Sequence, residues 1–161
     1  MEAAPIALVD VSEVADLAQE VTASFERDFV AAVANAEVHH VGATSLPFGH
    51  TKGDVDLNVR VDEAEFHVVV DALRQRLAVA QPDNWTETFA SFSSDAYSIP
   101  LGVQVTVIGS PDDFLLALRD RMRADGSLLR RYDDIKLATA SSGADAYWQA
   151  KDALLREVLD E

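Results

Sequence analysis

Apolar residues recur along this chain at two spacings, which predict a succession of helices and strands. A spacing of three to four residues runs through positions 11–34 and predicts an amphipathic helix. From Asp54 to Asp62 apolar and polar residues alternate strictly, which is the pattern of a strand with one buried face. The same criteria predict strands at 37–41, 85–93 and 101–108, a helix after Asp62, and helices at 110–126, 127–140 and 144–160.

The order of these elements predicts how the chain is organised. Helix and strand patterns alternate up to residue 110, and residues 111–161 have helical patterns only. No internal repeat, low-complexity tract or long linker separates the two parts, and 161 residues suffice to bury a core. We therefore expect one α/β (α+β) domain over 1–161, in which a small mixed β-sheet with flanking helices carries a C-terminal helical extension.

Several absences bear on the cellular compartment. The sequence contains no apolar run near the roughly 20 residues needed to cross a bilayer, and its start, MEAAPIALVD, lacks the layout of a signal peptide. It contains no cysteine, which fits a reducing compartment. We expect a cytoplasmic protein without membrane contact, and the pattern leaves the oligomeric state open.

The charge of the chain narrows the class of partner. A formal net charge of -15 disfavours general nucleic-acid binding, because affinity for a phosphate backbone comes from clustered lysine and arginine. Of the 13 basic residues only three are lysines, at Lys52, Lys136 and Lys151. In a chain that otherwise uses arginine, these positions are candidates for a compact ammonium group.

A turn of small residues follows the predicted strand 37–41. Gly42, Ala43, Thr44 and Ser45 can bring backbone N–H groups close to a phosphate, and the two hydroxyl groups add donors. A plain connection between two elements is the alternative interpretation. Taken alone, the turn does not establish a ligand.

Two aspartates lie shortly after this turn. Asp54 and Asp56 are two residues apart on a predicted strand, so both side chains leave the same face, with Cβ atoms about 7 Å apart. Mg²⁺ (or Mn²⁺) suits such a pair of carboxylates, whereas a solvated strand face is the alternative. A metal ion held between the aspartates and the phosphates of a nucleotide explains both motifs together.

The stretch from His40 to Val59, HVGATSLPFGHTKGDVDLNV, resembles the signature of the GrpB family and, more widely, the palm of polymerase-β-like nucleotidyltransferases. The helical segments FLLALRDRMR, YDDIK and YWQAK are similar to further elements of that family, so the resemblance covers roughly residues 35–158. In the first stretch Ala43 replaces a serine, and Asp54 corresponds to the first aspartate of the wider superfamily. The matching positions there are His40, Gly42, Thr44, Ser45, Pro47, Lys52 and Asp56.

The resemblance implies a nucleotidyltransferase palm that binds a nucleoside triphosphate (NTP) with Mg²⁺ and transfers a nucleotidyl group to an unknown hydroxyl acceptor. It implies that Asp54 and Asp56 are catalytic and hold the metal. It assigns the nucleotide phosphates to the turn and to the lysines, that is to Gly42, Ala43, Thr44, Ser45, Lys52, Lys136 and Lys151.

One departure from the family pattern supports a second interpretation. Active members of the superfamily generally need a third carboxylate on a later strand, where this chain has Gln104 and Thr106. Neither side chain can act as a base at neutral pH. A non-catalytic nucleotide-binding or regulatory module is therefore the alternative function, and an interaction protein without a ligand is the third.

Overall fold

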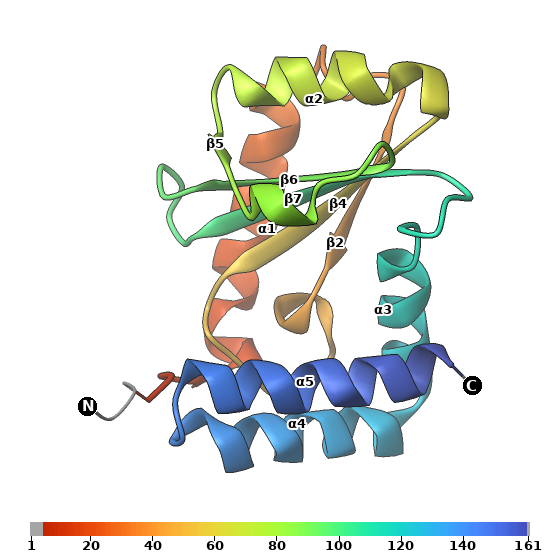
Figure 1. The fold of residues 1–161 in the computed structure, drawn as a ribbon. Coiled ribbons are helices and arrows are strands. Elements are labelled where there is room, and N and C mark those ends of the chain that lie inside the picture. The colour runs from red at the N-terminus through yellow and green to blue at the C-terminus, as the bar shows by residue number, and fades with distance from the viewer. Residues whose placement is uncertain (1–4, 161) are drawn as a thin grey trace.

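A five-stranded mixed sheet forms the centre of the computed structural model, which describes residues 5–160 (Figure 1). The strands follow the order β2-β4-β7-β6-β5. β4 and β7 are parallel, and the other pairings are antiparallel. The bounds are Glu37–Val41 for β2, Val55–Val61 for β4, Ala78–Val79 for β5, Phe89–Ser94 for β6 and Leu101–Val107 for β7. This topology confirms the predicted mixed α/β fold.

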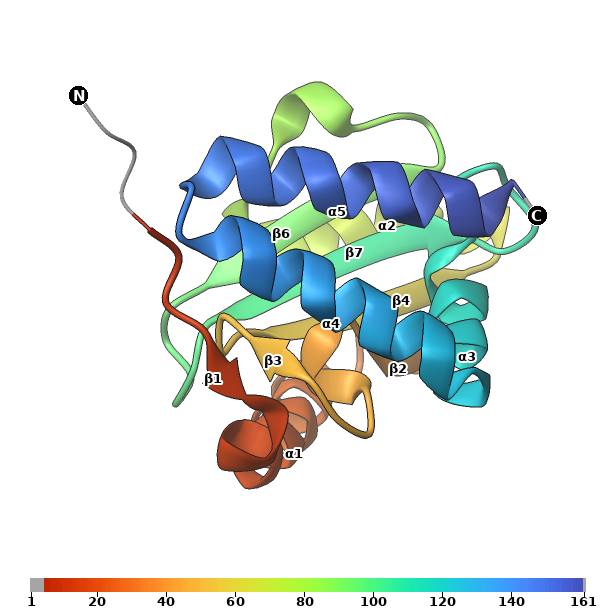
Figure 2. The same cartoon turned by 90° about the horizontal axis from the view of Figure 1, so that it is seen from below.

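Helices cover both faces of the sheet. α1 and α2 pack on one face, whereas α3, α4 and α5 lie on the other side, with α4 and α5 side by side in both views (Figures 1 and 2). The bounds are Val11–Asp28 for α1, Phe66–Arg74 for α2, Leu115–Ala124 for α3, Gly126–Ala140 for α4 and Ala144–Leu159 for α5. Within residues 5–160, none of the helices combines the length and apolar character needed to cross a bilayer.

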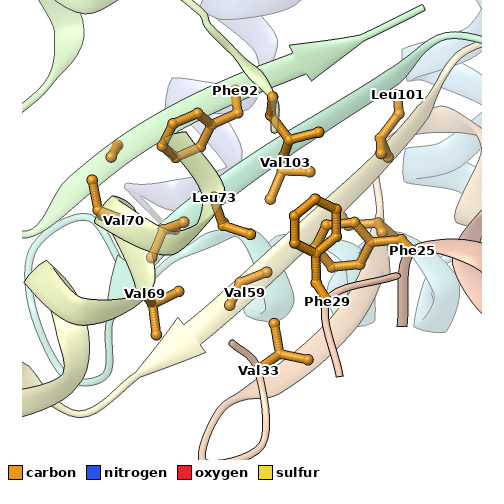
Figure 3. Close-up of a cluster of buried hydrophobic side chains, with 14 of the residues drawn as sticks. Phe25, Phe29, Val33, Val59, Val69, Val70, Leu73, Phe92, Leu101 and Val103 are labelled. Carbon is orange, nitrogen blue, oxygen red and sulfur yellow. The ribbon is translucent and has the colours of Figure 1, made fainter. Parts of the chain in front are cut away.

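The main hydrophobic core fills the space between the sheet and the helices α1 and α2 (Figure 3). The rings of Phe25 in α1 and of Phe29, which directly follows α1, pack at a centroid distance of 4.9 Å, and Leu73 of α2 is fully buried beside them. β4 contributes four side chains without solvent exposure, Val55, Leu57, Val59 and Val61. The strict alternation in β4 therefore reflects one apolar face, and its polar side chains project toward the α3–α5 side.

The first helix is shorter than its apolar spacing predicts. The prediction of a helix over 11–34 is wrong beyond Asp28, because α1 ends there and residues 29–34 form turns. The backbone leaves helical geometry at Phe29, with φ -119° and ψ 24°. Phe29 and Val33 still enter the core at the predicted spacing, so the periodicity records burial rather than helix length.

Two further boundaries differ from the prediction for identifiable reasons. The strand predicted at 85–93 is β6 and begins at Phe89, because Trp85 follows a 3-10 turn and its Nε1 donates to the Ala80 carbonyl at 3.0 Å. The helix predicted from residue 110 begins at Leu115. In the preceding turns the Asp113 carboxylate pairs with Arg60 of β4 at 2.7 Å, which fixes this segment to the sheet.

A small second sheet includes part of the connection between β2 and β4. It pairs β1 (Val9–Asp10) with β3 (His50–Thr51) in antiparallel fashion, and neither strand has a sequence pattern that predicts it. β3 and a 3-10 turn called η1 (Ala43–Ser45) connect β2 to β4. The stretch that carries the candidate chemistry is thus folded into short elements between two strands of the main sheet.

Candidate functional site

A cavity of about 380 Å³ lies between the polar face of the sheet and the helices α3 to α5. Its lining is of three chemical kinds. The charged side chains are those of Lys52, Asp54, Asp56, Arg119 and Lys151. The apolar side chains include those of Leu46, Leu115, Leu118, Met122 and Leu155. The neutral polar side chains are those of Gln81, Ser91, Ser93 and Gln104. The volume falls within the range of small-molecule sites, and the lining offers a ligand both charged and apolar contacts.

The register of the strands explains how polar side chains gather on one face. Residues paired across adjacent strands project from the same side of the sheet. One row therefore runs Val41, Asp56, Gly102, Ser93, and the next runs His39, Asn58, Gln104, Ser91. All four residues of the first row, in which Gly102 has no side chain, line the cavity.

The Asp56 carboxylate lies between two glycines. A Cβ at Gly42 would overlap Asp56 Oδ2, and a Cβ at Gly102 would lie 2.8 Å from Asp56 Oδ1. Gly42 also has φ 75° and ψ -174°, a conformation that side chains disfavour. Both positions therefore require glycine while Asp56 keeps this orientation. Gly42 allows the positive φ of the turn and also leaves space for the Asp56 carboxylate.

Electrostatics make Asp56 the unusual acid of the site. Burial, and then repulsion by Asp54, raise its pKa to about 6, although Lys151, Lys52 and a hydrogen bond from Gln104 act in the opposite direction. The ionised form is thus insufficiently compensated by the protein. A proton or a bound cation would relieve this imbalance.

Two lysines and a tryptophan border the acidic pair. Lys52 Nζ lies 3.8 Å from Asp54 Oδ2 and 4.4 Å from the centroid of the Trp148 ring. Lys151 Nζ lies 4.5 Å from the same ring. Trp148 and Lys151 belong to α5, so the C-terminal helix brings a cation to a site whose acids belong to the segment around β4.

The turn residues are placed less simply than the phosphate hypothesis implies. Gly42 borders the cavity, but Ala43, Thr44 and Ser45 are not among its lining residues. Thr44 Oγ1 lies 2.7 Å from His40 Nε2, and Ser45 Oγ donates to the Gly42 carbonyl at 2.6 Å, so both hydroxyl groups already have partners. The phosphate-binding role of this turn stays a prediction. Gly42 is the turn residue that lines the cavity, so its backbone is the group best placed to contact a phosphate.

Two arginines of α3 hold the turn and the end of the strand before it. Arg119 Nη1 donates to the His40 carbonyl at 3.0 Å, and Arg123 donates to the Ser45 carbonyl at 2.7 Å. Burial, followed by the nearby arginines, lowers the pKa of His40 to about 4. His40 is therefore neutral at physiological pH and serves as a hydrogen-bonding partner of Thr44.

Lys136 lies apart from the other two lysines. Its side chain is 2% exposed, and its ammonium group donates to the His50 carbonyl and lies 3.8 Å from Asp133 Oδ1. Asp133 in turn accepts the His50 N–H at 2.6 Å, which attaches β3 to α4. Burial lowers the pKa of Lys136 to about 8. Lys136 does not line the cavity, so its predicted phosphate contact is not among those that the structure brings together.

The sequence does not predict that several of the residues lining the cavity belong to the site. Trp148 is visible only as the neighbour of a tyrosine, three residues before Lys151. Gln81, which precedes Pro82, also lines the cavity and has φ 44°, a left-handed conformation that is rare for a non-glycine residue. The apolar residues of α3 repeat at helical spacing, but that spacing does not reveal that they face a cavity.

The residues present allow a test of the Mg²⁺ hypothesis. In the described range 5–160, no three His, Cys, Asp or Glu side chains cluster as metal ligands, so the carboxylates are limited to Asp54 and Asp56. Gln104 lies beside them, and its Oε1 is buried without a hydrogen-bond partner. Because Mg²⁺ is often held by one or two carboxylates together with substrate phosphates, this set fits the ion as part of a nucleotide complex.

Comparison with known proteins places the chain in a family. Residues 8–161 match the family model described as GrpB protein. The chain belongs to the GrpB family. This GrpB protein is 25% identical over 137 residues to a UPF0157 protein of Vibrio cholerae serotype O1, which covers 85% of this chain and 73% of that protein.

A solved structure shares the fold. The crystal structure of GrpB from Enterococcus faecalis superposes with a TM-score of 0.63 and covers 95% of this chain and 99% of that one. The two sequences are 17% identical, so this likeness concerns the fold alone. The predicted resemblance to the GrpB family is thereby confirmed.

Proposed function

We propose that this GrpB protein binds an NTP together with Mg²⁺ in the cavity and transfers a nucleotidyl group to a hydroxyl acceptor. The observation that carries the proposal is the juxtaposition of the Asp54–Asp56 pair with Lys52 and Lys151 in a cavity that also has apolar lining residues. A magnesium nucleotide combines a divalent cation, an anionic phosphate chain and a planar aromatic base. The acids suit the cation, the lysines suit the phosphates, and the apolar side chains suit the faces of the base.

The roles of the residues follow from their chemistry. Asp54 and Asp56 would hold the cation, which on binding neutralises phosphate charge. Lys52 and Lys151 would contact phosphate oxygens, and the leucines of α3 would accommodate the base. In the transfer, the acceptor oxygen forms a bond to the α-phosphorus while the bond to pyrophosphate breaks, and the acceptor proton leaves to solvent.

A specific observation supports the alternative of binding without turnover. Gln104 borders the cavity on β7, where a third carboxylate would be expected, and Thr106 is fully buried and accepts a hydrogen bond from Asn58 Nδ2 at 3.0 Å. Neither can take a proton from an acceptor hydroxyl. A nucleotide-binding or regulatory module would need only the contacts of the acids with the cation and of the lysines with phosphate.

Thermal-shift measurements with each NTP, with and without Mg²⁺ or Mn²⁺, test both functions. A nucleotide at 100 times its Kd should stabilise the fold by about 2.7 kcal/mol. We expect metal-dependent stabilisation in the wild type, its loss in Asp54→Asn and Asp56→Asn, and wild-type behaviour in Asp71→Asn, whose exposed carboxylate lies on α2 away from the cavity. If no nucleotide stabilises the protein in a metal-dependent way, both functions are wrong.

Turnover is tested separately. Pyrophosphate release from the nucleotide that binds is followed with small hydroxyl compounds and with hydroxyl-bearing proteins as acceptors. Release that requires an acceptor and disappears in Asp56→Asn supports transfer. Tight metal-dependent binding without pyrophosphate release in the presence of any acceptor supports the regulatory module.

A further inference from the structure

Two buried amide oxygens near the acidic pair have no hydrogen-bond partner. They are Gln104 Oε1 on β7 and Asn58 Oδ1 on β4. The two residues are paired in register, so their side chains project from the same face of the sheet in adjacent positions. Buried acceptors usually have donors, and two unpartnered oxygens at paired positions therefore require an explanation.

The orientation of both amides follows from their neighbours. Asn58 Nδ2 donates to the Gln104 carbonyl at 3.1 Å and to Thr106 Oγ1 at 3.0 Å, which leaves Asn58 Oδ1 on the other side. A Cβ placed on Gly102 would lie 2.8 Å from Asp56 Oδ1 and 3.9 Å from Gln104 Nε2, so the Gln104 N–H₂ group faces the carboxylate. Only this end can donate to an ionised Asp56, and Oε1 must then face away.

A half turn of the Gln104 amide would change both contacts. It exchanges the positions of Nε2 and Oε1 without moving the backbone, and it turns the N–H₂ group away from Asp56. Asn58, whose Oδ1 has no partner, holds the paired position on β4. It also places Oε1 against Asp56, where two oxygen atoms repel each other unless a positive charge lies between them. The two orientations therefore differ in what they require at Asp56.

We propose that Gln104 is an occupancy-dependent ligand: when a divalent cation binds Asp54 and Asp56, the Gln104 amide rotates, Oε1 becomes a third oxygen ligand, and Nε2 donates to Asn58 Oδ1. This inference rests on the cation-binding part of the proposed function and is independent of the nucleotide. A carboxamide oxygen is an ordinary ligand for hard cations. It adds no negative charge to a site in which two carboxylates already face Lys52 and Lys151.

This role would explain why β7 carries Gln104 rather than a third carboxylate. A third acid beside Asp56 would add a further negative charge to a cavity that Asp54 and Asp56 already line. A neutral ligand completes the oxygen set only while the cation is present, and it stabilises the free carboxylate by a hydrogen bond while the cation is absent. Gln104 can perform both tasks, whereas a glutamate can perform only the first.

Side-chain amide resonances report the rotation directly. ¹⁵N-labelled protein is titrated with MgCl₂ alone, and the Gln104 signal is assigned by its loss in Gln104→Glu. We expect Mg²⁺ to shift the NH₂ signals of Gln104 and Asn58 together, with the same apparent Kd, and to shift neither in Asp56→Asn. Backbone changes around Asp56 without a change of the Gln104 NH₂ signal would overturn the inference, and so would the absence of any Mg²⁺ response.

Binding constants provide the second test. Gln104 borders the cavity, so Gln104→Met can be accommodated, and its fold is checked by circular dichroism against Gln19→Met, an exposed control on α1. Mn²⁺ binding, measured by electron paramagnetic resonance without nucleotide, should weaken about ten-fold or more in Gln104→Met and persist in Gln104→Glu. Equal Kd values for wild type and Gln104→Met would overturn the inference. That result would leave the proposed nucleotide binding open, because the thermal-shift assay with NTPs tests it independently.

Discussion

Asparagine in place of Asp56 should stabilise the free protein, although it removes a residue of the site. The pKa of this carboxyl is raised from 3.8 to about 6 by burial and by Asp54. A difference of about two units between the folded and unfolded states corresponds to about 3 kcal/mol of destabilisation once the group is ionised. Asparagine has the same shape and no charge, so it should recover most of this free energy.

The pH dependence has a definite sign. An acid with a higher pKa in the folded state contributes stability that is fully present below its unfolded pKa and is lost as pH rises through the folded value. For Asp56 the window runs from about pH 4 to above about pH 6. His40 acts in the opposite direction in the same range, because its lowered pKa makes the fold lose stability as pH falls from its ordinary value of 6.5 to about 4.

Urea unfolding of wild type and Asp56→Asn at several pH values separates the two groups, because His40 is common to both proteins. The difference in unfolding free energy should be near zero at about pH 4 and rise to about 3 kcal/mol at about pH 8. Asp71→Asn serves as the surface control and should show no such trend. A difference that is independent of pH, or an Asp56→Asn protein that is less stable at pH 8, would refute the reasoning.

Three further substitutions test the close packing around Asp56 and the different positions of two lysines. Gly102→Ala should destabilise the fold by about 1–3 kcal/mol in urea unfolding, because the new Cβ would lie 2.8 Å from Asp56 Oδ1. Gly126→Ala is the matched control, since a Cβ there meets nothing within 4 Å, and an equal loss in both would contradict the close packing around Asp56. Lys151→Met should weaken Mg·ATP binding about ten-fold in thermal-shift titrations, because a charge-assisted contact to phosphate is lost. Lys136→Met should lower the melting temperature but leave Mg·ATP binding within about two-fold, because Lys136 donates to the His50 carbonyl outside the cavity. An equal loss of Mg·ATP binding in both lysine variants would show that Lys136 reaches the ligand.

The parts of the fold that could be predicted are those that depend on local alternation. β4 is predictable because its four buried aliphatic residues and its polar residues occupy opposite faces, and this pattern also places Asp54 and Asp56 on one side. The end of α1 is not predictable in the same way. Phe29 and Val33 keep helical spacing while the backbone has left the helix, because burial requires their positions and not a particular hydrogen-bond pattern.

The lysines show where sequence reasoning reaches its limit. Tyr132 and Lys136 have the same spacing as Tyr147 and Lys151, and each pair lies on one face of a helix. In the fold, α4 turns Tyr132 toward the cavity and Lys136 into a buried cluster with Asp133, whereas α5 turns Lys151 toward the cavity and buries Tyr147. Helical periodicity identifies such a face, but the packing of α4 against α5 and the sheet determines what that face meets.

The arrangement around Asp56 is difficult to explain as packing alone. Gly42 and Gly102, which come from distant parts of the chain, both leave space for its carboxylate. An apolar side chain would fill that space without the cost of the charge, which the raised pKa of Asp56 indicates. A half-buried acid that destabilises the free protein is compensated when a cation or proton binds, because the binding free energy then adds to the folded state alone. Saturating Mg²⁺ should therefore raise the stability of the wild type toward that of Asp56→Asn without changing the variant. A ten-fold excess over Kd would account for about 1.4 kcal/mol of this convergence. If Mg²⁺ stabilises both proteins equally, the ion binds elsewhere and Asp56 has no part in holding it.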